Sequence, residues 1–239
     1  RSSLEKSSHQ VKVKVMDASE LYDPEFRELI KSKKPTIIIP VGSTEQHGAH
    51  LPITTDSDIV TEIASRLAKK CGFIVFPTIN YGISFEHSPL FNTSVTATAL
   101  GIILSNIVTS LVENGVTSII ILNGHHGNAQ ILGRVKDTWG VLSYWHFMKH
   151  EFDHAGFVET SIMLAISDKV KMKKAKKGLI TKGLSKEEKE RISKLSTERG
   201  GFPKVAKNGV WGDPTGATKK DGEKFLAEIV RNLAKECQT

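Results

Sequence analysis

Short apolar runs alternate along the chain with longer stretches in which apolar residues recur every three or four positions. The runs at residues 35–42 and 117–124 each hold three consecutive Ile, which is typical of strands buried on both faces. Between them, residues 57–70 carry apolar side chains on one face of a helix that Gly72 is expected to end. This alternation predicts an α/β fold, with a mostly parallel sheet flanked by helices on both faces.

The same patterns predict the other elements. Further strands are expected at residues 11–15, 73–79 and 141–148, and further helices at residues 23–32, 98–114, 128–139, 159–166 and 218–236. No internal repeat or linker divides the chain, so residues 1–239 are expected to form one α/β domain, in which residues 1–15 are a poorly ordered or edge segment.

Composition places the chain among ordinary globular proteins, with 39% hydrophobic and 25% charged residues. No apolar run approaches the roughly 20 residues that cross a bilayer, so no membrane association is expected. The polar first residues show no secretory signal, although a chain that starts at Arg1 leaves a preceding leader open. Cys71 and Cys237 form neither a CxxC motif nor a disulfide framework, which predicts a cytoplasmic location.

The charge of the chain is basic, with a net charge of +7 and a pI of about 9.3. Residues 169–194 carry eleven Lys or Arg against three Glu. This segment has two interpretations, an attractive surface for phosphate or a solvated surface segment. It contains no aromatic residues, so the stacking half of a single-stranded nucleic-acid groove is missing. We therefore expect a solvated surface segment.

Ionisable side chains cluster where two predicted strands end. Glu45, His47 and Asp56 lie in the stretch GSTEQHGAHLPITTD, which follows the first Ile-rich run, and His125 lies in NGHHGN after the second. Carboxyl ends of parallel strands meet at one edge of a sheet, so these side chains can converge. Carboxylate and imidazole ligands suit zinc, manganese or iron(II), and a bridging carboxylate can hold two metals. The pattern predicts a metal site.

Each residue also has a simpler interpretation. Asp56 by itself could cap a helix, and Asn123-Gly124 could form an ordinary turn after a strand. A single His in a loop is more often a hydrogen-bonding residue than a metal ligand. The occurrence of all these residues at two strand ends favours the metal site over the separate simple interpretations.

These two motifs, together with HAGFVETS at residues 154–161, resemble those of the creatininase family of metal-dependent amidohydrolases. The resemblance covers residues 36–165, with a weaker echo at residues 209–218. It implies a creatininase-like fold, two divalent metal ions (zinc, iron or manganese) and a small-molecule substrate. It also implies a homo-oligomer, often a hexamer.

The resemblance assigns a role to each residue of the cluster. It implies that Glu45 and His125 bind one metal, that His47 binds the other, and that Asp56 bridges both.

One position departs from the family pattern. Creatinine-cleaving members carry a further Glu two positions after the His that matches His125, whereas this chain has Gly127. The second metal is then one ligand short, and we expect Glu159 to supply it and to take part in catalysis. The alternative is that Glu159 is only an acidic residue in the first turn of a helix, where the helix dipole favours it.

The remaining site residues also follow from the resemblance. His154 matches the proton-transferring His of the family, and we expect the adjacent Asp153 to orient it. The alternative for His154 is an ordinary surface residue beside Asp153. The loop at residues 85–95 resembles the one that walls the substrate pocket, and the residues expected to contact substrate or support the site are His50, Glu86, His87 and His126.

Together these features predict a metal-dependent hydrolase of a non-peptide C–N bond, either a cyclic amide or a formamide. A formylaminopyrimidine nucleotide deformylase is favoured, because Gly127 speaks against a creatinine amidohydrolase. A peptidase of a modified peptide precursor is a further alternative. A nucleic-acid or phosphate-binding protein with a degenerate metal site is the alternative from another class, but phosphate binding requires Lys and Arg rather than carboxylates.

Overall fold

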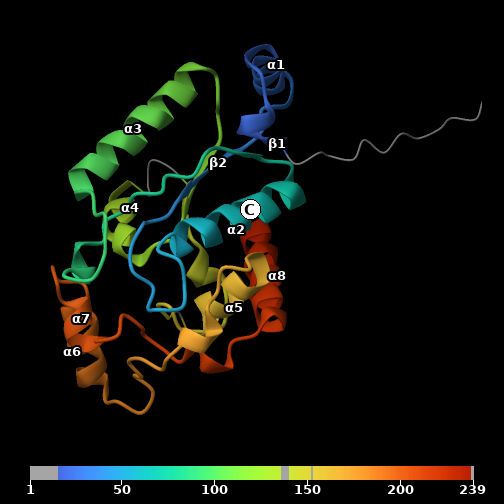
Figure 1. The fold of residues 1–239 in the computed structure, drawn as a ribbon. Helices are drawn as coiled ribbons and strands as arrows, with labels where there is room; N and C mark the ends of the chain where they lie inside the picture. Colours follow the sequence, from blue (N-terminus) through green and yellow to red (C-terminus); the bar gives the residue numbers. More distant parts are fainter. Residues whose placement is uncertain (1–15, 136–139, 152, 238–239) are drawn as a thin grey trace, which may run out of the picture.

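The computed structural model describes residues 16–135, 140–151 and 153–237 (Figure 1). Within these residues, five strands form one sheet in the order β1-β3-β2-β4-β5, and all neighbouring strands are parallel. The strands are β1 (Met16–Asp17), β2 (Ile37–Val41), β3 (Ile74–Val75), β4 (Ile119–Asn123) and β5 (Gly140–Ser143). The expected strand at residues 11–15 and the end of the expected helix at residues 136–139 lie outside the described residues.

Helices cover both faces of this sheet, which confirms the predicted α/β fold. In Figure 1, α1 and α3 lie on one side of the sheet and α2, α5 and α8 on the other. The α-helices of the described residues are α1 (Asp23–Lys33), α2 (Thr55–Cys71), α3 (Ala97–Glu113), α4 (Ala129–Val135), α5 (Phe157–Ile166), α6 (Lys186–Ser196), α7 (Phe202–Val205) and α8 (Lys219–Glu236). No helix in this part of the chain is long and apolar enough to span a membrane.

The Ile-rich strands separate two hydrophobic cores. Ile38 and Leu122 pack into the core formed with α2, α5 and α8, whereas Ile37, Ile39 and Ile121 pack into the core formed with α1, α3 and α4. Successive side chains of a strand point to opposite faces, so a strand covered on both faces must be apolar throughout. The consecutive Ile residues of β2 and β4 satisfy this requirement.

The strand predicted at residues 73–79 is wrong beyond Val75, and Pro40 in the neighbouring strand β2 explains why. The carbonyl of Pro40 faces the β3 side, where it accepts the N–H of Ile79 at 2.9 Å. The backbone N–H and C=O of one strand residue point toward the same neighbour, so Pro40 also lacks a donor on that side. The chain leaves the ladder after Val75, contains Pro77, and returns where the carbonyl of Ile79 accepts the N–H of Gly42 at 2.9 Å.

One further prediction needs correction. The strand expected at residues 141–148 ends at Ser143 and continues as a short 3-10 helix, Tyr144–Phe147. The basic segment at residues 169–194 contains no buried residue, as expected of a solvated surface segment, and its last part forms most of α6. This helix begins with a capping box, in which Ser185 accepts the N–H of Glu188 at 3.2 Å and Glu188 accepts the N–H of Ser185 at 2.9 Å.

Candidate metal centre

The order of the strands brings the two chemical motifs together. Val41 at the end of β2 is the register partner of Asn123 at the end of β4, so the loops that follow leave the same edge of the sheet. The first turn of α2 packs directly against this edge. A Cβ atom on Gly124 would lie 2.9 Å from the backbone oxygen of Asp56 and 2.6 Å from the Val60 side chain. Only glycine at position 124 therefore lets α2 bring Asp56 so close to the strand ends.

One buried group of metal-ligating atoms consists of Glu45, Asp56 and His125, whose ligand atoms all lie within 4.8 Å of one another. His125 Nδ1 is 2.9 Å from Asp56 Oδ2, and His125 Nε2 is 3.3 Å from Glu45 Oε2. The hydroxyl of Ser43 donates to Glu45 Oε2 at 2.9 Å. The side chains of Glu45 and Asp56 are 0% and 2% exposed, so both carboxylates are removed from bulk water.

A second buried group consists of His47, Asp56 and Glu159. His47 Nε2 is 3.1 Å from Asp56 Oδ1 and 3.6 Å from Glu159 Oε2. The other ring nitrogen of His47 lies 3.1 Å from the backbone oxygen of Glu45, which orients the imidazole. Asp56 therefore turns one oxygen toward each group, because its Oδ2 faces His125 and its Oδ1 faces His47.

The charges of this cluster are unbalanced in the protein alone. Burial raises the pKa of Glu159 to about 8, so burial opposes a negative charge on this carboxyl. Burial also opposes a charge on His47, yet the nearby Asp56, Glu159 and Glu45 carboxylates raise its pKa to about 10. The buried Oε1 atom of Glu159 has no hydrogen-bond partner among the described residues. Divalent cations would supply both the positive charge and the missing partner, so the residues present fit a metal centre.

Gly127 occupies a position where this backbone leaves no room for a side chain. A Cβ atom there would overlap the backbone oxygen of Ile83 and lie 2.5 Å from His125 Nε2 and 2.8 Å from Glu86 Oε1. The third side chain of the second group comes instead from α5, where Glu159 is the third residue. The backbone N–H of Ala155 donates to Glu159 Oε2 at 2.7 Å and holds this carboxyl in place.

His154 lies at the edge of the same cluster and is buried, so the interpretation as an ordinary surface residue is wrong. Its Nδ1 is 3.9 Å from Glu45 Oε1, and its Nε2 is 3.1 Å from the backbone oxygen of Gln46. Burial lowers the pKa of His154 well below its usual value, which keeps the imidazole neutral at pH 7. Asp153 makes different contacts from those expected, because it accepts the N–H of Val158, in the first turn of α5, at 2.9 Å.

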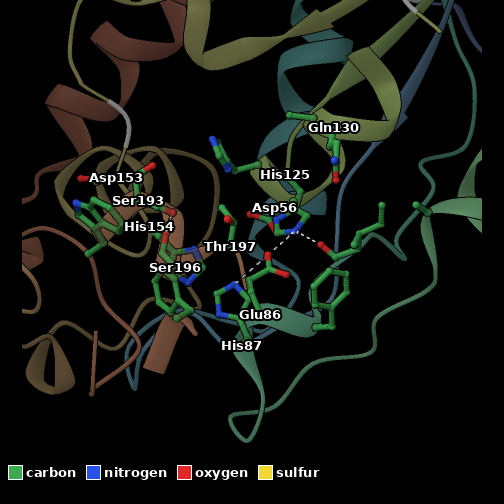
Figure 2. A pocket seen from close by; sticks show the side chains of 18 residues that line it. Asp56, Glu86, His87, His125, Gln130, Asp153, His154, Ser193, Ser196 and Thr197 are labelled. Atoms are coloured by element: carbon green, nitrogen blue, oxygen red, sulfur yellow. Dashed lines mark hydrogen bonds and ion pairs between the residues drawn. The ribbon is translucent and has the colours of Figure 1, made fainter. Parts of the chain in front are cut away.

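The four expected substrate or supporting residues fall into two sets. Glu86, His87 and His126 line a cavity of about 600 Å³ beside the cluster, together with Asp56, His125 and His154. Figure 2 labels all of these residues except His126. His50 does not line this cavity. It is buried, and its Nε2 lies 2.9 Å from the hydroxyl of Thr160 in α5.

Another wall of the cavity comes from a part of the chain that the sequence patterns did not assign to the site. Hydroxyl side chains of α6 and the residue after it line this wall, together with an aromatic residue of α7 (Figure 2). These residues are Ser193, Ser196, Thr197 and Phe202. The capping signal at Ser185 and Glu188 could have predicted α6, but no local signal indicates that this helix reaches the strand ends.

Gln46 is a further residue that the sequence analysis left without a role. Its Nε2 lies 2.9 Å from His87 Nδ1 and 3.1 Å from His154 Nε2, while its Oε1 accepts the N–H of Gly48 at 3.0 Å. The bond from Gly48 fixes the orientation of the amide, and the amide nitrogen then holds two imidazoles of the site in place.

Comparison with known proteins agrees with this geometry. A family model described as creatininase, creatinine amidohydrolase, matches residues 19–237. The chain belongs to the creatininase family. It is accordingly a metal-dependent hydrolase that acts on C–N bonds, as the sequence predicts.

Relatives within the creatininase family carry several names. The chain is 35% identical over 218 residues to a mycofactocin precursor peptide peptidase of Mycobacterium ulcerans, and the match covers 84% of each chain. It is 27% identical over 153 residues to a 2-amino-5-formylamino-6-ribosylaminopyrimidin-4(3H)-one 5′-monophosphate deformylase of Methanosphaera stadtmanae, covering 57% of this chain and 62% of the relative.

Solved structures of creatininases share the fold. One crystal structure of creatinine amidohydrolase superposes with a TM-score of 0.77 at 23% identity, covering 93% of this chain and 96% of the other. Further solved structures with this fold are a Zn–Zn form of a mutant creatininase and an Mn form of creatininase. The homo-oligomer that the family resemblance implies stays a prediction.

Proposed function

We propose that this enzyme hydrolyses an amide bond of a peptide-derived substrate at a pair of divalent metal ions. The observation that carries the proposal is the position of Asp56, whose two oxygens face separate buried donor groups. The residues that would hold one ion are Glu45, Asp56 and His125, and those for the other are His47, Asp56 and Glu159. Their oxygen and imidazole ligands suit zinc, manganese or iron.

Two metal ions held by these residues would polarise a substrate carbonyl and lower the pKa of a bound water. The protein supplies the proton transfers. His154 is neutral and lines the cavity, so it can accept a proton from the attacking water and donate one to the nitrogen that leaves. The water oxygen bonds to the carbonyl carbon, the C–N bond breaks, and the products are an acid and an amine. The amide of Gln46 and the ring of Phe202, centred 4.8 Å away, hold the His154 imidazole.

Two observations support a peptide-derived substrate. The peptidase relative matches a larger part of the chain, at higher identity, than the deformylase relative does. The cavity of about 600 Å³ lies within the range of roughly 300–1,000 Å³ typical of sites for drug-sized ligands. That volume accommodates the end of a peptide. The formylaminopyrimidine nucleotide favoured by the sequence analysis is the second candidate, which the Methanosphaera relative supports.

The test combines metal analysis with a substrate panel. Purified protein is analysed for bound metal and assayed with short peptides, creatinine and the formylaminopyrimidine nucleotide. Asp56→Asn removes the shared carboxylate, and Asp58→Asn is the matched control, because Asp58 lies on the same helix and is paired with the Thr54 hydroxyl instead. We expect Asp56→Asn to lose both metals and more activity than the roughly 10–100-fold lost with a group that only supports a ligand.

The panel and the variants test separate parts of the proposal. An Asp56→Asn protein with full metal content contradicts the shared-ligand assignment. Hydrolysis of the nucleotide without hydrolysis of any peptide contradicts the peptide assignment and establishes the second candidate.

A further inference from the structure

Arg199 lies in a short connection that joins two residues of the cavity lining. The connection runs from Thr197, directly after α6, to Phe202, the first residue of α7, and both end residues line the cavity. The backbone N–H of Gly200 donates to the carbonyl oxygen of Phe85 at 3.1 Å, which ties the connection to the opposite loop. Residues before and after Arg199 in the chain therefore belong to the cavity wall.

The guanidinium group of Arg199 is placed against the same loop. Its central carbon lies 5.3 Å from the centroid of the Phe85 ring, and Phe85 lines the cavity. This distance is that of a cation–π contact, which leaves the N–H groups of a guanidinium available for hydrogen bonds. No carboxylate lies within 4.0 Å of Arg199 among the described residues. The adjacent Glu86 turns its Oε1 to within 3.7 Å of His125 Nε2, so it faces the metal centre.

Two hydroxyls of this wall, those of Ser196 and Thr197, offer acceptors rather than donors. The hydroxyl of Ser196 donates to the backbone oxygen of Ser193 at 2.8 Å, and the hydroxyl of Thr197 donates to that of Lys194 at 2.9 Å. Each hydroxyl has one proton, so both present only lone pairs to a ligand. None of the described residues that line the cavity is Lys or Arg. Arg199 itself lies outside this lining, but its contact with the Phe85 ring places a cation at the edge of the cavity on this side.

We propose that Arg199 forms an oxyanion-binding subsite at the α6–α7 wall, which holds the terminal carboxylate of a peptide substrate. The inference rests on the proposed peptide hydrolysis. The hydroxyl oxygens of Ser196 and Thr197 can accept peptide N–H groups, while the planar guanidinium binds a carboxylate through two parallel hydrogen bonds. A phosphate would satisfy the same guanidinium. The backbone N–H groups of a peptide match the acceptor hydroxyls, and this match favours the carboxylate.

Equilibrium binding without turnover tests the subsite. N-acetyl-alanyl-alanine and its C-terminal amide are titrated into the full chain, and the signal is the tryptophan fluorescence, since Trp211 lines the cavity. We expect the wild-type protein to bind the acid about tenfold more tightly than the amide. Arg199→Ala abolishes this preference, and Arg199→Lys retains part of it. Arg191→Ala is the matched control, because Arg191 is an exposed arginine of α6 without the ring contact that Arg199 makes with Phe85, and it retains the full preference.

A second ligand pair separates the two sources of an oxyanion. A ribonucleoside and its 5′-monophosphate are titrated in the same way. A preference confined to this pair and lost in Arg199→Ala overturns the peptide carboxylate in favour of a phosphate. Wild-type protein that binds acid and amide equally, or binds neither, overturns the subsite itself, as does an unchanged preference in Arg199→Ala. These results are independent of the hydrolysis lost in Asp56→Asn, so the subsite and the proposed function can fail separately.

Discussion

The two walls of the cavity are built in opposite ways. The wall at the strand ends is backed by buried ionisable side chains from the loops after β2 and β4 and from the first turns of α2 and α5, and these carboxylates and imidazoles contact one another. The wall from α6 and α7 consists of short hydroxyl side chains and Phe202, with the exposed Arg199 at its edge. Burying a charge is costly unless its partners are in place, whereas surface polar groups exchange partners with water. The first wall is therefore suited to the reaction and the second to the choice of substrate.

The sharpest test of this contrast adds a single methyl group next to the buried wall. Gly127→Ala places a Cβ against the backbone oxygen of Ile83 and the ring of His125, so it must displace a donor of the first group. We expect unfolding to become easier by about 1–3 kcal/mol, the usual cost of overpacking, with loss of bound metal. Denaturant unfolding and metal analysis measure both effects.

Gly133→Ala is the matched control, because nothing lies within 4 Å of a Cβ at this position of α4. Alanine in a helix is favoured over glycine by roughly 0.5–1 kcal/mol, so this variant should be more stable and keep its metal. Equal behaviour of the two variants would contradict the packing described for Gly127.

Removal of one carboxylate charge should separate the two donor groups. Glu159→Gln keeps the shape of the side chain and its bond to Ala155 but weakens the second group, so about one of two metal equivalents should be lost. Glu190→Gln on α6 is the control, because its contact with Lys186 at 3.8 Å is exposed. If Glu159→Gln retains both metals with unchanged affinity, Glu159 is not a ligand.

Changes in the α6 wall should leave the metals in place. Thr197→Val keeps the volume of the side chain and removes the acceptor that faces the cavity. We expect unchanged metal content and kcat, with a KM raised about 2–10-fold, since one uncharged hydrogen bond is lost. Steady-state kinetics on the best substrate of the panel measure this effect, and loss of metal in this variant would break the distinction between the walls.

The smallest expected effect is on the unfolding free energy, and it comes from an ion pair away from both walls. Arg66 Nη1 lies 2.7 Å from Glu223 Oε2, and the hydrogen bond from Arg66 lowers the pKa of Glu223. The pair therefore stabilises the fold above pH ~4.5, and this contribution is lost as the pH falls through the lowered pKa. Both side chains are a third to a half exposed, so we expect less than about 1 kcal/mol. The difference in unfolding free energy between wild type and Glu223→Gln should shrink toward pH 3.

The sequence patterns predicted the elements whose apolar residues form a regular pattern along the chain. The Ile-rich strands β2 and β4 and the helices α2, α3 and α8 follow from apolar spacing, because one face or both faces of each element are buried. The end of β3 was missed because it depends on Pro40 in another strand, a contact between residues far apart in the sequence. Local spacing carries no record of such a partner.

The candidate site divides in the same way. Glu45, His47, Asp56 and His125 could be expected together because parallel strands end at one edge of a sheet. The role of Gln46 could not, because its partners are imidazoles from two other loops. The α6 wall was missed since its sequence is mostly charged and its contact with the cavity is tertiary.

The tight fit around Gly127 also restricts how this enzyme can change. An acidic residue at position 127 requires that the Ile83 backbone shift first. A single substitution therefore cannot replace the carboxylate of Glu159 by one at position 127. The order of mutations would decide which intermediates survive. Laboratory evolution toward a creatinine-cleaving enzyme should therefore first select changes in the loop that contains Ile83.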